Sequence, residues 1–318
     1  EELRSKFQLS HDLAQGLESR NEQGQYATDF HLARLIVKAA IKAGDFSAQR
    51  GLRFFEPSVG SGSFFSALIK ESQNLPILSA TGVEINPKLA LFASSHWKEY
   101  GLDVIQSDIF DFIENQKVIS NLIVTNPPYS RHHHIEKSQK IALQELVEKM
   151  TGIRLSGLSG LHCYIMAIAH IFLESGGVSA WLVPQEILDV GYSKNLKRIL
   201  FSQHEIFRIH HFGSNDSKFG DASVTSIVVF MRKKSKQCQS LQTIQFTVGE
   251  INDPEQVNSA EMEMEDCDKR WSKYFSSESH IVQESSGIAL SEIFTVRRGI
   301  ATGKNAFFIN PLEYWKSI

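Results

Sequence analysis

The sequence of 318 residues predicts an α/β fold with a seven-stranded, mostly parallel sheet whose last strand is antiparallel. Short apolar runs alternate with helical patterns along much of the chain, as is typical of strand–helix–strand units. An acidic residue follows or closes each of the first three runs, and parallel strands bring their carboxyl ends to one edge of a sheet. The last two runs are joined by a loop without a helix, and such a connection requires an antiparallel pair.

Composition narrows the class of protein. Hydrophobic residues make up 42% and charged residues 22%, an ordinary balance for a globular protein. No apolar run approaches the roughly 20 residues of a membrane helix, and no secretory signal pattern is present. Three cysteines without CxxC spacing argue against a zinc site or a disulfide framework, so we expect a cytoplasmic location. The chain starts at Glu1 without a methionine, which suggests a fragment.

Charge gives little support to a nucleic-acid partner. The net charge is −3, whereas phosphate binding favours basic surfaces. The distribution is uneven, because residues 194–236 are basic and residues 250–268 are acidic.

The first segment of interest precedes the predicted sheet. Residues 1–24 are polar with scattered leucines and predict a helix followed by a loop. The sequence Gly-Gln-Tyr-Ala-Thr-Asp at 24–29 then leads into a helical pattern that begins near Leu32. Thr28 and Asp29 are both suitable N-cap residues for that helix.

A glycine-rich turn follows the first predicted strand. Gly60 and Gly62 would let a ligand approach the backbone near a helix start. A dinucleotide fingerprint would need a third glycine where Phe65 stands, so the turn is a poor cradle for pyrophosphate. Glu56, at the strand end, would repel phosphates and attract a cation. The turn therefore favours a ligand with an ammonium or sulfonium group, the alternative being a tight strand–helix turn.

The second and third strands also lead to acidic residues. Glu84 is placed to bind ribose hydroxyls, although it could also serve as a helix N-terminal carboxylate before Pro87. Asp108 follows the strand at 103–107 and could accept a hydrogen bond from an exocyclic amine, or lie as a solvated loop acid.

The fourth strand, 121–125, ends in Asn-Pro-Pro-Tyr at 126–129. Two prolines cannot donate to a sheet, so the strand must stop there and deliver an amide, two carbonyls and a phenol to the sheet edge. Alone, this tetrapeptide could be an ordinary proline turn. Three successive histidines at 132–134 do not predict a metal site, because adjacent residues do not face one way.

The remaining pattern predicts a helix at 161–174 ended by two glycines, a strand at 178–184, a helix at 189–201 and strands at 205–212 and 224–230. The loop between the last two strands contains Phe219, which is either an anchor in the core or a stacking surface. A strand-like piece at 241–248 follows, and a new unit begins near residue 293.

Together these segments resemble adenine-specific N6 DNA methyltransferases of type II restriction-modification systems, in the Taq and Eco57-like order with cofactor motifs first and the recognition domain last. The resemblance covers roughly residues 20–310 and includes 298–305, which resemble the beginning of the recognition domain. It implies a Rossmann-like class I methyltransferase fold that binds S-adenosylmethionine and needs no metal. The implied cofactor residues are Tyr26, Thr28, Glu56, Ser58, Gly60, Gly62, Glu84, Ile85, Asp108, Ile109 and Asn126. The implied catalytic residues are Asn126, Pro127, Pro128, Tyr129 and Phe219.

The resemblance also implies a domain layout and a partner. We expect a catalytic domain at 1–235, with an N-terminal helical part at 1–45, then a linker or peripheral segment at 236–285 and the start of a truncated recognition domain at 286–318. The implied partner is double-stranded DNA with a specific site, and a nuclease domain or subunit would lie outside this chain.

Three alternatives remain open. Release-factor-type protein glutamine methyltransferases also use an Asn-Pro-Pro-Tyr segment to bind an amide, but their chains would end soon after the seventh strand. A structured-RNA methyltransferase is the second alternative. A non-catalytic DNA-specificity subunit is the third, although such a module would not need the acids and glycines.

Overall fold

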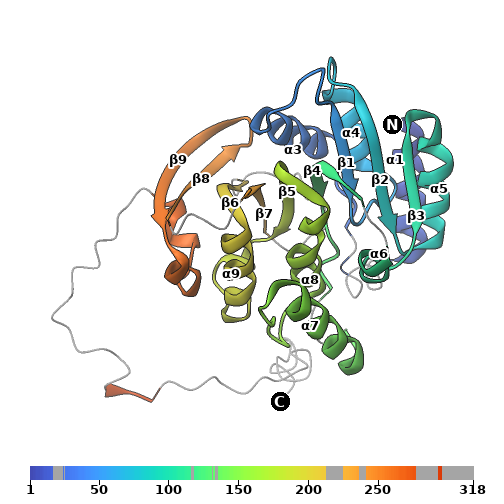
Figure 1. Ribbon diagram of the computed structural model, residues 1–318. Coiled ribbons are helices and arrows are strands. Elements are labelled where there is room, and N and C mark those ends of the chain that lie inside the picture. Colours follow the sequence, from blue (N-terminus) through green and yellow to red (C-terminus); the bar gives the residue numbers. More distant parts are fainter. Residues whose placement is uncertain are drawn as a thin grey trace, which may run out of the picture. The chain divides into compact units, whose positions relative to one another are not determined.

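The computed structural model describes residues 1–16, 24, 26–115, 118–130, 132, 135–212, 225–235, 241–276 and 293–295. The chain divides into two compact units, Glu1–Ser277 and Glu278–Ile318, and every element named below belongs to the first. The first unit is organised on a nine-stranded sheet in the order β3-β2-β1-β4-β5-β7-β6-β8-β9 (Figure 1).

The predicted seven strands form one continuous part of this sheet. Five of them run parallel, in the order β3-β2-β1-β4-β5, and β7 pairs antiparallel with both β5 and β6. The α/β class and the antiparallel last strand are therefore confirmed. These strands are β1 (Leu52–Glu56), β2 (Ile77–Glu84), β3 (Leu102–Gln106), β4 (Ser120–Thr125), β5 (Leu173–Pro184), β6 (His204–His211) and β7 (Ser226–Lys233).

Two further strands lie within residues 236–285. β8 (Gln242–Glu250) pairs parallel with β6, and β9 (Asp253–Met262) pairs antiparallel with β8. The strand-like piece predicted at 241–248 corresponds to β8, and with β9 the sheet has nine strands rather than the seven predicted. β9 is an edge strand with only Met262 buried, so its acidic sequence lacks the apolar alternation that predicts a strand.

Helices cover both faces of the parallel half of the sheet. Alternate residues of β1 enter different cores, Phe54 on one face and Phe55 on the other. The Phe54 face is covered by α3 (Phe30–Ala43), α4 (Ser63–Glu71) and α5 (Pro87–Trp97). The Phe55 face is covered by α6 (Ile109–Asn115), α7 (Lys137–Thr151), α8 (Leu161–Ile168) and α9 (Lys194–Gln203). Helix α1 (Glu2–Gln15) precedes them.

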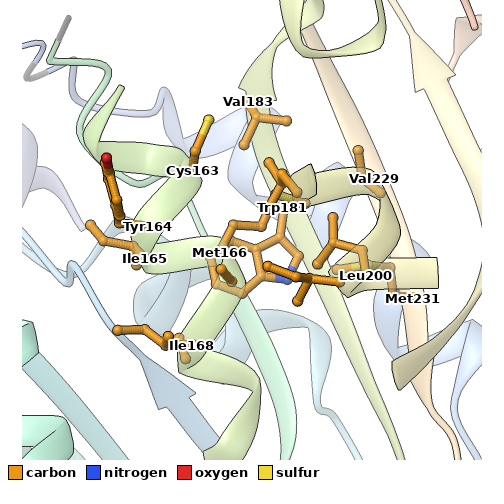
Figure 2. Packing of buried hydrophobic residues seen from close by; sticks show 14 of the residues in the cluster. Cys163, Tyr164, Ile165, Met166, Ile168, Trp181, Val183, Leu200, Val229 and Met231 are labelled. Carbon is orange, nitrogen blue, oxygen red and sulfur yellow. The ribbon is translucent and has the colours of Figure 1, made fainter. Parts of the chain in front are cut away.

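The helix predicted at 161–174 is shorter than expected. It ends at Ile168, a 3-10 turn follows at Ala169–Phe172, and both glycines lie inside β5. A register shift between β4 and β5 accommodates these extra residues at the start of the strand. All residues of α8 except Leu161 are buried. Figure 2 shows the ring of Trp181 of β5 between Met166 of α8 and Leu200 of α9.

The segment before α3 settles which residue caps that helix. Asp29 accepts hydrogen bonds from the N–H groups of His31 and Leu32, so Thr28 remains available for other contacts. Among the helices that the structure describes, none is long and apolar enough to cross a membrane.

Candidate functional site

A cavity of about 200 Å³ opens at the carboxyl edge of the parallel strands. The acids that end or follow the first three strands line it together with the amide that follows β4. The predicted residues that line this cavity are Tyr26, Thr28, Glu56, Ser58, Gly60, Glu84, Ile85, Asp108, Ile109, Asn126 and Pro128. Residues as far apart in the sequence as Tyr26 and Asn126, 100 positions, therefore share one site, as the parallel order requires.

Among the predicted site residues that the structure describes, three do not line the cavity. Gly62 caps α4 with φ 89°, and a Cβ there would collide with the ring of Trp97, so this glycine serves packing. Pro127 is buried and Tyr129 is half-buried. Phe219 lies outside the described residues.

The side chain of Asn126 has a defined orientation. Its Nδ2 donates to the carbonyl oxygen of Tyr26 at 2.9 Å and to Oγ1 of Thr28 at 3.0 Å. Both N–H groups are thus used, and Oδ1 is buried without a hydrogen-bond partner in the described structure. Burying an unpaired carbonyl oxygen is unfavourable, so this position is suited to a ligand that donates an N–H.

Tyr129 is held from both its backbone and its phenol. Its N–H donates to the carbonyl of Gly24 at 2.8 Å, and its Oη donates to the carbonyl of Leu182 at 3.1 Å. Burial raises the pKa of the phenol, so it stays protonated at neutral pH. The ring lies 6.2 Å from that of Tyr26 and meets the buried ring of His162 edge to face. Tyr129 therefore has a fixed position at the end of the Asn-Pro-Pro-Tyr segment.

Glu56 is an almost fully buried carboxyl, with 2% of its surface exposed. Its Oε2 has no hydrogen-bond partner in the described structure. Burial raises its pKa well above the ordinary value and the charge of Glu84 adds to this, while the guanidinium of Arg4 opposes the shift. A cationic ligand group beside Glu56 would stabilise the ionised carboxylate.

Glu84 links the glycine turn to the end of β2. Its Oε2 accepts from the N–H of Gly60 at 2.9 Å, and its Oε1 accepts from the N–H of Asn86 at 2.8 Å. Burial raises its pKa, and these backbone N–H groups oppose the shift. Each carboxylate oxygen has a second lone pair, so Glu84 retains capacity to accept from a hydroxyl.

Asp108 lies at the start of α6. Its Oδ1 accepts from the N–H of Phe110 at 2.9 Å, and burial raises its pKa. The neighbouring Ser107 donates its N–H to the carbonyl of Glu84 at 3.1 Å, which ties the ends of β2 and β3 together.

Sequence reasoning missed a second group of lining residues. They are Gln8, His11, Asp12 and Gln15 of α1, Gln139 of α7, and Leu161 and Ile165 of α8. Only a helical projection of residues 1–16 would have indicated the α1 group. Among the described residues, no cluster of three or more His, Cys, Asp or Glu side chains could hold a metal ion.

Comparison with solved structures identifies the fold class. The chain superposes on a Listeria monocytogenes protein described as a class I S-adenosylmethionine-dependent methyltransferase, with a TM-score of 0.61 and 14% identity over 80% of this chain and 74% of that one. The fold is that of class I S-adenosylmethionine-dependent methyltransferases, as predicted, and S-adenosylmethionine is the cofactor of that class. Residues 84–219 match the family model of the Eco57I restriction-modification methylase. This part of the chain is similar to these methylases, and the predicted resemblance to restriction-modification methyltransferases is confirmed.

Sequence relatives agree with this placement. The type II methyltransferase M.XamI of Xanthomonas campestris pv. amaranthicola is 25% identical over 81% of this chain and 48% of its own length. M.AccI of Acinetobacter calcoaceticus is 23% identical over 92% of this chain and 54% of its own length. The chain thus spans about half the length of these relatives. A shorter match, 40% identical over 22% of this chain and 30% of the relative, is to a tRNA1(Val) (adenine(37)-N6)-methyltransferase of Yersinia pestis.

Proposed function

We propose that this chain is the catalytic part of a site-specific DNA adenine-N6 methyltransferase of a restriction-modification system. The observation that carries this proposal is the side chain of Asn126, whose two N–H groups are held while its Oδ1 is buried and unpaired at the cavity. An amide oxygen fixed in this way accepts an N–H, and the exocyclic amine of adenine offers two.

These acceptors would act on the lone pair of the amine. In free adenine that lone pair is delocalised into the ring, which makes N6 a poor nucleophile. Hydrogen bonds from N6 to Oδ1 of Asn126 and to the carbonyl of Pro127 favour a pyramidal nitrogen, whose lone pair then points out of the ring system. Positioning and electrostatics supply the rate, without a covalent nucleophile.

The residues around the cavity suit the proposed cofactor. Glu56 would bind its cationic amino-acid end, since this carboxyl is buried with a free oxygen. Glu84 would bind the ribose hydroxyls and Asp108 the exocyclic amine of its adenine. When bound, S-adenosylmethionine supplies a methyl group on a positively charged sulfonium.

The target adenine would reach Asn126 only outside the double helix, because N6 is inaccessible in a stacked duplex. Tyr129, fixed through its backbone and its phenol, would offer one aromatic face to the flipped base. We assign the second face to Phe219 by resemblance. Each stacking contact would contribute about 1–3 kcal/mol.

The direct test offers tritiated S-adenosylmethionine together with duplex DNA, tRNA or a release factor, in parallel, to the complete protein that contains this chain. We expect label in DNA, recovered as N6-methyladenine after digestion. Label in tRNA alone would favour the second candidate, an RNA adenine methyltransferase, which the match to the tRNA methyltransferase supports. DNA binding without label in any acceptor would indicate a non-catalytic subunit.

A variant tests the assigned role of the amide. Asn126→Ala removes the acceptor and should abolish methyl transfer, while cofactor affinity stays close to that of the parent protein. Full turnover by this variant would contradict the role of Asn126, even if the parent protein methylates DNA.

A further inference from the structure

Helix α1 presents its polar side to the protein and its leucines to solvent. Arg4, Gln8, His11, Asp12 and Gln15 recur at spacings of three and four residues, which place them on one stripe of the helix. Its three leucines are 59%, 62% and 74% exposed. A helix on a protein core ordinarily turns its apolar stripe inward, so the reversed arrangement needs a polar partner on the inner side.

The inner side of α1 faces the cavity of the proposed cofactor site. Gln8, His11, Asp12 and Gln15 line that cavity together with the acids at the sheet edge. Arg4, only 3% exposed, donates from Nη1 to Oγ of Ser61 in the glycine turn at 3.0 Å.

The other end of the stripe lies near the end of β2. His11 and Gln15 also border a second cavity together with Asn86, Pro87 and Lys88. The helix therefore extends from the glycine turn toward the loop that follows Glu84, the residue proposed to bind ribose.

His11 carries the strongest sign of a ligand within this stripe. Its Nε2 is buried and has no hydrogen-bond partner among the described residues. The ring stacks on Phe7 at 6.2 Å between centroids, and Phe7 stacks on Phe92 of α5 at 3.9 Å. Packing thus holds the imidazole at the cavity wall while one nitrogen stays unpaired, and such a group is costly unless a ligand satisfies it.

We propose that α1 forms a wall of the S-adenosylmethionine site and that Nε2 of His11 hydrogen-bonds the nucleoside half of the cofactor. This inference rests on the proposed function, which assigns the cofactor to this cavity. The nucleoside half is favoured because His11 lies beside the loop after Glu84. Ribose hydroxyls and adenine nitrogens can also donate or accept, so they match an imidazole in either tautomer.

The test compares two ligands by isothermal titration calorimetry of the complete protein. One is S-adenosylmethionine, and the other is 5′-methylthioadenosine, which keeps the nucleoside but lacks the amino-acid end. His11→Phe preserves a ring that can stack on Phe7 and removes both nitrogens. We expect His11→Phe to lower the affinity for both ligands by the same factor, about threefold to tenfold, which corresponds to the loss of one hydrogen bond. The control Leu13→Ala, on the exposed side of α1, should leave both affinities unchanged.

The possible results distinguish a failure of the role of His11 from a failure of the proposed cofactor assignment. If the parent protein fails to bind S-adenosylmethionine, the cofactor assignment fails. If it binds and His11→Phe retains both affinities, the role of His11 is wrong. A loss limited to S-adenosylmethionine would contradict the nucleoside contact. Hydrogen exchange gives a second measurement, independent of how the variant folds: 5′-methylthioadenosine should slow exchange of residues 1–16 in the parent protein, and unchanged exchange would overturn the proposed wall.

Discussion

The side-chain amide of Asn126 donates a hydrogen bond to Oγ1 of Thr28 over 3.0 Å, although the two residues are 98 positions apart in the sequence. Asp29 caps α3, so the hydroxyl of Thr28 is free to accept this bond. Thr28 is therefore a positioning residue in the proposed mechanism: it fixes which way the amide of Asn126 points.

Thr28→Val should slow methyl transfer. Valine keeps the shape of threonine but cannot accept from Nδ2, so the amide of Asn126 loses one of its two anchors. We expect kcat to fall about threefold to tenfold, in line with the value of one neutral hydrogen bond. Steady-state kinetics measure this, and Thr28→Ser, which keeps the hydroxyl, should retain most of kcat. Equal losses in both variants would show that the hydroxyl does not position the amide.

Glu56→Gln should alter how stability depends on pH. Because burial raises the pKa of Glu56 in the folded protein, its contribution to stability is present below the ordinary value of 4.5 and is lost as pH rises through the raised folded value. The glutamine of the variant does not ionise, so the variant does not lose this stability. Without cofactor, its Tm should increasingly exceed that of the parent protein as pH rises from 4.5 toward neutrality.

Glu56→Gln should also lower the affinity for S-adenosylmethionine, because the cationic end of the cofactor would lose its carboxylate partner. Saturating cofactor should then reduce the Tm advantage of Glu56→Gln at neutral pH. Parallel Tm curves for the two proteins across this pH range would rule out a buried, destabilising carboxyl at Glu56.

Gly62→Ala and Gly60→Ala form a matched pair. Both glycines have positive φ, 89° and 54°, so alanine at either costs about 1–2 kcal/mol of backbone strain. At Gly62 the new Cβ also collides with Trp97, whereas nothing lies within 4 Å of a Cβ at Gly60. Denaturant unfolding should therefore show the larger loss for Gly62→Ala, by about 1 kcal/mol or more.

Cofactor affinity should fall more in Gly60→Ala than in Gly62→Ala, the reverse of the order in stability. Gly60 lines the cavity, so a methyl group there would intrude on the ligand, while Gly62 is not among the lining residues. A greater loss of cofactor affinity in Gly62→Ala than in Gly60→Ala, measured at a temperature where both are folded, would contradict this division of roles.

Phe219→Ala should weaken binding of the flipped base. We expect the fluorescence rise of 2-aminopurine at the target position of a DNA duplex to diminish, since one of two stacking partners is lost. Cofactor affinity should stay the same. An unchanged 2-aminopurine signal would remove Phe219 from the base-binding site.

The parallel half of the fold and the sheet-edge side of the cavity could be predicted because both depend on local signals. Glu56 closes an apolar strand, while Asp108 and Asn126 each follow one, and parallel strands bring such positions to one edge. The apolar run before Asn126 and the two prolines after it placed the end of β4 correctly.

The parts that were missed depend on long-range packing. The strand β9 has an acidic, exposed sequence and is held by its backbone pairing with β8, so its side chains carry little strand pattern. The 3-10 turn at Ala169–Phe172 is apolar and reads as a continuation of α8. The stripe around His11 is polar and resembles a solvated helix face, although it lines the cavity.

The hydrogen bonds from Asn126 to Tyr26 and Thr28 mean that the residues that orient the amide lie in a different part of the chain from the sheet that carries it. Every strand of the sheet lies after these two residues, so a polypeptide that started at α3 would retain each strand and the acids Glu56, Glu84 and Asp108 at the sheet edge. It would lack both acceptors that orient the amide. In the proposed mechanism a short N-terminal segment outside the sheet would thus decide whether the amide can act, and changing that segment would switch the site off while the sheet is preserved.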